Sequence, residues 1–218
     1  MRRSEKRFAG FKKRRVPIMI ADMEETPEEK QTEKSPLIGQ MLIATPAIGD
    51  ERFERSVIVV CAHSDDHAMG IVVNKPMGEI RLGDLLDQLG IESTIELPDR
   101  QVLAGGPVDK ERGFVLHSDD YHSDDSTVGI RDGLGLTATK EVLEAIASET
   151  APQQSTLALG YAGWGPGQLE EELRASAWLT CEASEALVFG EDLETKWESA
   201  LRSIGVNPAM LSSMTGMA

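Results

Sequence analysis

The chain has 218 residues, 40% of them hydrophobic, which is enough for one domain with a substantial core. Its 37 acidic residues outnumber 22 lysines and arginines, and the resulting net charge of −15 repels nucleic-acid phosphates. No apolar run approaches the roughly 18 to 20 residues that span a bilayer, and Val16–Ala21 is too short for a signal peptide. We therefore expect a cytoplasmic protein whose acidic body binds neither DNA nor membranes.

The first 36 residues are predicted to form a disordered extension. Residues 1–15 carry eight lysines or arginines against one glutamate, whereas residues 22–36 are acidic and contain two prolines. The basic tail leaves nucleic acid, an anionic membrane or an acidic partner open as targets. Met19 and Met23 are alternative translation starts. A single folded domain is expected over residues 37–218.

Short apolar runs rich in valine and isoleucine predict buried strands. In chain order these lie at 39–44, 56–62, 70–74, 102–106, 113–117, 126–130, 155–161 and, as ALVFG, 186–190. The link 62–69 is too short for a helical crossover, so the strands on either side of it should be antiparallel neighbours.

Helices follow from apolar residues at helical spacing. Leu82, Leu85, Leu86 and Leu89 fall at i, i+3, i+4 and i+7, and Gly90 is placed to end that helix. Further helices are expected at 140–148, 168–178 and 193–204. The alternation predicts a mixed α/β domain that begins with antiparallel hairpins.

All four histidines lie in acidic tracts, HSDDH at 63–67 and HSDDYHSDD at 117–125. Histidine with carboxylates suits zinc, manganese or iron, so a metal-dependent hydrolase is one alternative if His63 and His117 emerge at the same end of a sheet. HSDD is also good turn chemistry, in which serine and aspartate bond their own backbone amides. We expect no cofactor and no resident metal.

The sequence gives little support for nucleophilic catalysis or for nucleotide binding. Cys61 and His63 would share a strand face, which can activate a thiol, but a cysteine directly after VIVV is expected to be a small buried hydrophobe. The glycines before Gln168 lack a nucleotide-binding spacing, and Glu170–Glu172 would repel phosphate. We predict no catalytic residue.

Four segments carry a family resemblance. Residues 42–76, 102–118, 157–179 and 196–218 resemble the YqgE/AlgH family of bacterial proteins. The resemblance implies an α/β fold in which a bifurcated sheet curls into a pseudo-barrel with helices packed outside. It implies no established activity, and the description of the family as a transcriptional regulator comes from one branch linked to exopolysaccharide production.

Three turns hold candidate residues for binding a partner protein, a peptide or a small ligand. The candidates are Asn74 and Lys75, then Gly105, Gly106 and Pro107, then Tyr161, Trp164 and Gln168, with His117 in addition. If the turns converge, they form a cleft. The sequence predicts a non-enzymatic binding or regulatory protein that acts through protein contacts rather than on DNA directly. The hydrolase and nucleic-acid binding through the basic tail are the alternatives.

Overall fold

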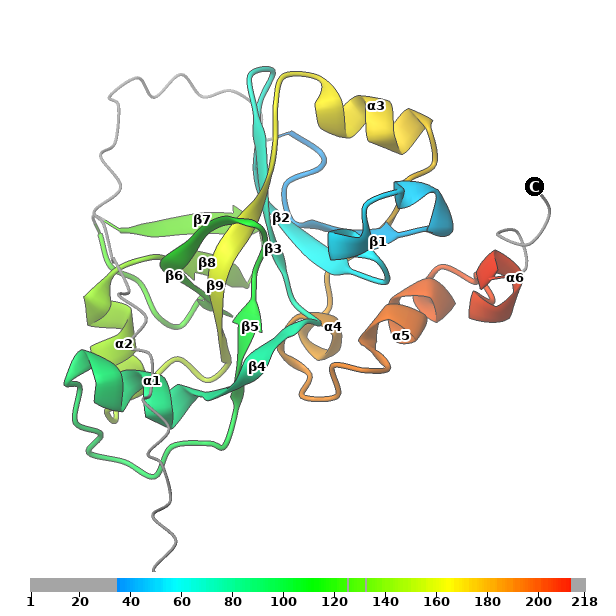
Figure 1. Ribbon diagram of the computed structural model, residues 1–218. Helices are drawn as coiled ribbons and strands as arrows, with labels where there is room; N and C mark the ends of the chain where they lie inside the picture. The colour runs from blue at the N-terminus through cyan, green and yellow to red at the C-terminus, as the bar shows by residue number, and fades with distance from the viewer. Residues whose placement is uncertain (1–34, 125, 132, 213–218) are drawn as a thin grey trace, which may run out of the picture.

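The computed structural model describes residues 35–124, 126–131 and 133–212. In these residues a strongly curled, mostly antiparallel sheet forms a half-barrel with helices outside it (Figure 1). The sheet order is β10-β1-β2-β3-β9-β6-β8-β7, with β4 and β5 branching off beside β9. The strands are β1 (Gln40–Ala44), β2 (Val57–His63), β3 (Ala68–Val72), β4 (Pro76–Arg81), β5 (Gln101–Ala104), β6 (Val108–Ser118), β7 (Thr127–Arg131), β8 (Leu134–Thr137), β9 (Ser155–Trp164) and β10 (Trp178–Glu182).

Strand β9 belongs to two branches of the sheet. Its last residues, 162–164, pair with β3, whereas residues 155–161 pair with β6. Strand β5 joins the same strand in parallel at Ala158 and Leu159. The bifurcated, curled sheet that the resemblance implies is therefore confirmed.

Strands β1 and β2 bury side chains on both faces. Met41 and Val59 point into one apolar core, and Leu42 and Ile58 point into another. Burial on both faces requires unbroken apolar runs, which is why these strands are readable in the sequence. The predicted antiparallel pairing of β2 and β3, the strands on either side of the link 62–69, is also confirmed.

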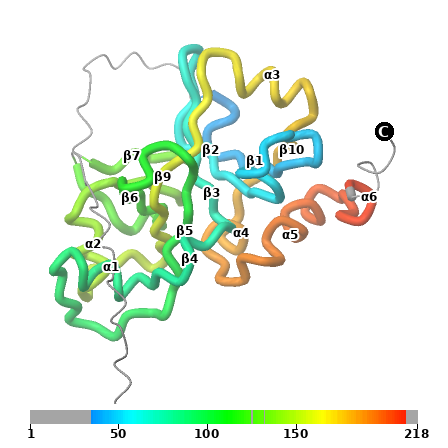
Figure 2. Tube along the Cα trace, viewed as in Figure 1, coloured from blue at the N-terminus to red at the C-terminus, as the bar shows by residue number. Residues whose placement is uncertain are grey.

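The helices pack on both sides of the sheet. They are α1 (Leu82–Leu89), α2 (Lys140–Ile146), α3 (Gln168–Arg174), α4 (Glu185–Phe189), α5 (Lys196–Ser203) and α6 (Pro208–Ser212), with 3-10 turns η1 (Pro46–Ile48) and η2 (Glu51–Phe53). Helices α1 and α2 lie on one side, and α3, α5 and α6 lie on the side of β1 and β10 (Figure 2). None of the described helices is long and apolar enough to cross a bilayer.

Two predictions for the C-terminal third are wrong. The predicted helix 168–178 ends at Arg174, because Ser176 adopts a left-handed φ of 57° and Trp178 begins the unpredicted strand β10. The predicted strand at 186–190 is helix α4, whose first turn is capped by the Ser184 side chain accepting from the Leu187 N–H. The helix predicted from Leu82 to Leu89, ended by Gly90, is confirmed with those bounds. The helices predicted at 140–148 and 193–204 are present with slightly shorter bounds. Of the predicted extension 1–36, residues 1–34 lie outside the described part of the chain.

Candidate functional site

A surface pocket of about 390 Å³ lies between the β1–β2 loop and α5. We term it the Arg55 pocket. Its lining residues are Ala44, Thr45, Pro46, Ile48, Gly49, Asp50, Glu51, Glu54, Arg55 and Trp197. This lining combines apolar side chains with charges of both signs.

The loop that forms most of the pocket is held by its own polar side chains. Thr45 Oγ1 accepts from the Ala47 N–H at 3.1 Å and donates to the Ser176 carbonyl at 2.7 Å. Asp50 accepts from the Arg52 N–H at 3.0 Å and pairs with its guanidinium at 2.7 Å. The hydrogen bond from the Arg52 side chain lowers the pKa of Asp50. These bonds fix the backbone of the loop from within.

The turn of Asn74, Lys75 and Pro76, which we term the NKP turn, binds the end of this loop from its inner side. Asn74 is buried, and its amide donates to the Arg55 carbonyl and accepts from the Val57 N–H, each at 2.8 Å. Lys75 Nζ donates to the Glu54 carbonyl at 2.5 Å. These bonds hold Arg55 at φ 52°, in a left-handed conformation that is unfavourable for residues other than glycine. The turn shapes the backbone of the Arg55 pocket.

Arg55 and Trp197 stack at one side of the pocket. The guanidinium carbon lies 5.3 Å from the centroid of the Trp197 ring, and the indole N–H donates to the Ala44 carbonyl at 2.8 Å. Arg55 is exposed, and among the described residues no carboxylate lies within ion-pair distance of it. Two other arginines of this region are paired, Arg52 with Asp50 and Arg202 with Glu198.

Lys196 fixes the base of α5 beside the same pocket. Its ammonium group is buried and donates to the Val73 carbonyl at 2.9 Å and the Val188 carbonyl at 3.2 Å. Burial lowers the pKa of Lys196 to about 8, and the charge of Asp192 opposes this effect. Lys196 does not stand out in the sequence, because it lies in a charged segment and resembles a surface lysine.

The turn of Gly105, Gly106 and Pro107, which we term the GGP turn, lies beside the NKP turn and against β9. The Ala104 N–H donates to the Lys75 carbonyl at 2.8 Å, which joins the two turns. A Cβ on Gly106 would lie 2.0 Å from the Tyr161 carbonyl carbon, so only glycine permits this approach. Pro107 follows, half-buried, at the start of β6. Tyr161 stacks edge-on against Phe114, with ring centroids 5.7 Å apart.

Trp164 and Gln168 lie at the far end of β9, where they hold helix α3. Glu172 accepts from the indole N–H of Trp164 at 2.8 Å and of Trp178 at 2.7 Å. Gln168 Oε1 accepts from the Gly165 N–H at 3.1 Å. Asn74 and Lys75 therefore meet the turn of Gly105–Pro107, which also contacts Tyr161, whereas Trp164 and Gln168 lie apart from them at the attachment of α3.

The histidine tracts lie at opposite ends of the sheet. His63 pairs with Ala68 of β3, which in turn pairs with Trp164 at the end of β9. His117 instead pairs with Ser155 at the start of β9. Along the contour of β9 these levels are about 30 Å apart, at roughly 3.3 Å per residue. The condition for a shared metal site is therefore not met, and within the described residues no group of three or more metal-ligating side chains is gathered.

Each of the two histidines has a local partner instead. His63 Nε2 lies 2.6 Å from Glu170 Oε1. The buried His117 bonds Thr137 Oγ1 through Nε2 at 2.9 Å, and its Nδ1 lies 2.8 Å from the Ser118 carbonyl. Burial lowers the pKa of His117, which favours its neutral form inside the fold.

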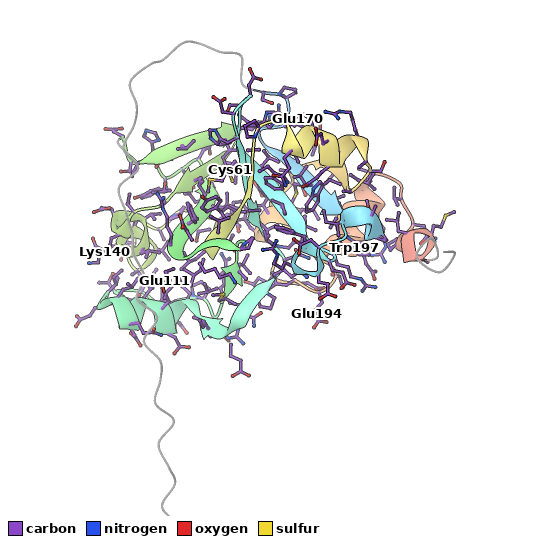
Figure 3. The ribbon with its side chains drawn as sticks, turned by 45° about the horizontal axis from the view of Figure 1, so that its top comes forward. Cys61, Glu111, Lys140, Glu170, Glu194 and Trp197 are labelled. Carbon is purple, nitrogen blue, oxygen red and sulfur yellow. The ribbon has the colours of Figure 1, made fainter. Side chains whose placement is uncertain are left out.

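Cys61 lies among the side chains inside the sheet, whereas Glu170 and Trp197 mark α3 and α5 (Figure 3). Burial raises the pKa of the Cys61 thiol to about 12. A thiol of this kind is not a nucleophile at neutral pH. Its position agrees with the expectation of a small buried hydrophobe.

The curled sheet, the outer helices and the mixed-charge surface pocket define an α/β half-barrel protein. The sequence model described as AlgH-like matches residues 41–209. The chain belongs to this AlgH-like family, as the resemblance of its four segments indicates.

Curated relatives extend along most of the chain. A UPF0301 protein of Caulobacter vibrioides is 52% identical over 183 residues, covering 84% of this chain and 94% of the relative. A UPF0301 protein of Methylobacterium sp. strain 4-46 is 54% identical over 189 residues, covering 84% of this chain and 90% of the relative. The residues that the AlgH-like model matches include both the Arg55 pocket loop and helix α5.

Solved structures share the architecture. The solution structure of the AlgH protein from Pseudomonas aeruginosa is 38% identical, with a TM-score of 0.66 over 87% of this chain and 98% of that protein. The crystal structure of DIP2367 from Corynebacterium diphtheriae has a TM-score of 0.64 over 85% of this chain and 95% of that protein, at 20% identity. The second likeness concerns the fold alone.

Proposed function

We propose that this protein is a non-enzymatic binding protein of the cytoplasm that contacts a partner protein through the Arg55 pocket. Any effect on transcription would then be indirect, through that partner. The proposal is carried by the hydrogen bonds that Asn74 and Lys75 direct at the pocket loop. They hold Arg55 in an unfavourable backbone conformation, and such local strain is typical of functional sites.

The chemistry of the pocket supports binding rather than catalysis. Its lining contains no histidine or cysteine, and its only indole ring is covered by a guanidinium group. The nearby ionisable group with a strongly lowered pKa, Lys196, is buried and already hydrogen-bonded. An exposed mixed-charge pocket on an ordered loop is suited to a polar peptide segment.

The test is affinity purification of the tagged full-length chain from its own host, with quantitative mass spectrometry. Three forms are compared: the native protein, Arg55→Glu in the pocket, and Arg81→Glu as a matched charge reversal on β4, outside the pocket. A partner retained by the native protein and Arg81→Glu but lost from Arg55→Glu supports the proposal. A partner set that is the same for all three forms contradicts it.

The same experiment addresses the alternatives. A form that lacks residues 1–22 tests whether nucleic acid is held by the basic tail, whose salt-sensitive binding should then vanish. Elemental analysis of the eluate tests the hydrolase. Stoichiometric metal in the absence of a protein partner would favour the metal-dependent hydrolase over the binding protein.

A further inference from the structure

Arg55 is presented as a fixed donor of hydrogen bonds with no acidic partner among the described residues. Its backbone is held by Asn74, and its guanidinium lies over the Trp197 ring at 5.3 Å. Stacking on an aromatic face orients the plane of a guanidinium and leaves its N–H edge available. Such an edge matches the two oxygens of a carboxylate.

We propose that the Arg55 pocket binds the free α-carboxylate at the C-terminus of a partner protein, with Arg55 as the residue that pairs with it. This inference rests on the proposed function and specifies the chemistry of the partner. At about 390 Å³, the pocket is near the lower end of the range of about 300 to 1,000 Å³ for small-ligand sites. It therefore suits the last one or two residues of a chain better than a chain that continues through it.

The remaining lining defines which chain end fits. Pro46 and Ile48 provide an apolar surface for the last side chain. Glu51 and Glu54 line the same pocket, and no basic side chain of the described residues lies within ion-pair distance of either. Two such carboxylates favour basic residues just before the end and disfavour acidic ones. The expected ligand is a basic segment that ends in an apolar residue with a free carboxylate.

Isothermal titration calorimetry with three peptides tests this assignment. The first is acetyl-Gly-Lys-Lys-Ala-Leu with a free carboxylate, the second is the same peptide with a C-terminal amide, and the third is an amide with glutamate in place of alanine. The full chain is used at about 50 mM salt, where exposed charges are weakly screened. The free acid is expected to bind at least about tenfold more tightly than its amide, as for loss of a charged hydrogen bond.

Arg55→Gly is the decisive variant, because glycine adopts the left-handed conformation without strain and the fold is kept. It should weaken the free acid about tenfold and leave the amide unchanged, whereas Arg55→Lys should lose part of the affinity and Arg81→Gln none. Circular dichroism melts establish that each variant is folded.

Several results would overturn the inference: equal binding of acid and amide, unchanged binding by Arg55→Gly, or no heat up to about 1 mM peptide. Equal affinity for the internal glutamate amide would reassign the site to acidic side chains and reject the chain end. If any of these occurs while Arg55→Glu still loses its partner in the host, the proposed function stands and the carboxylate assignment fails.

Discussion

Replacing Lys196 with methionine should remove a gain in stability that the native protein acquires between pH 8 and pH 10. Lys196 is 3% exposed, and burial lowers its pKa from 10.5 to about 8. Between these values the unfolded chain binds a proton that the folded chain has released, so the free energy of unfolding rises with pH. The gap of 10.5 − 8 corresponds to about 3 kcal/mol in total, of which about 1 kcal/mol is gained by pH 9.

The assay is urea unfolding followed by tryptophan fluorescence at pH 7, 8, 9 and 10, for the native protein and Lys196→Met. Subtracting the two curves removes the titration of all groups that they share. Lys140→Met, at an exposed lysine on α2, controls for the loss of a positive charge. If the difference between native protein and Lys196→Met stays constant from pH 7 to pH 10, the buried ammonium is not responsible and the reasoning is refuted.

Three further predictions test other parts of the structure. Cys61, buried and with its pKa raised to about 12, should resist a thiol reagent at pH 8 until guanidinium unfolds the chain, and rapid labelling of the native protein would contradict this. Glu172→Ala should lower the free energy of unfolding by about 2 kcal/mol, because two indole N–H groups lose their acceptor, so unchanged urea unfolding would count against that role. Gly106→Ala should fail to fold, since its Cβ would lie 2.0 Å from Tyr161, whereas Gly165→Ala, with its nearest atom at 3.9 Å, should give a native circular dichroism spectrum.

The strands of the core can be predicted from the sequence because both of their faces are buried. The run 186–190 shows the limit of that signal: it is equally apolar, but a stretch of five residues has no period that separates strand from helix. Ser184, a helix cap, decides the outcome. Strand β4 is not predicted from the sequence, because it begins with Pro76 and is largely exposed. It therefore contains no apolar run that would indicate a strand.

The candidate site is harder to predict than the fold. Residues 45–55 have the composition of an ordinary surface loop, and each residue taken alone indicates only a turn. The loop is shaped by Asn74, which is 19 residues from Arg55. The neighbouring helix α5 is anchored by Lys196, which is 123 residues from the Val73 carbonyl that it binds. Such side-chain-to-backbone bonds follow no periodicity. The residues Asn74 and Lys75 stand out in the sequence, but nothing in the sequence links them to Arg55.

Strand β9 sets the order in which this fold can assemble during synthesis. Its residues 155–164 are the common neighbour of β3 and β6, and β1 receives its outer partner only when β10 at 178–182 is complete. The apolar strands translated first therefore leave the ribosome without the segments that cover them. Unpaired strand edges invite association between chains, so we expect the nascent chain to depend on chaperone protection until its last third emerges.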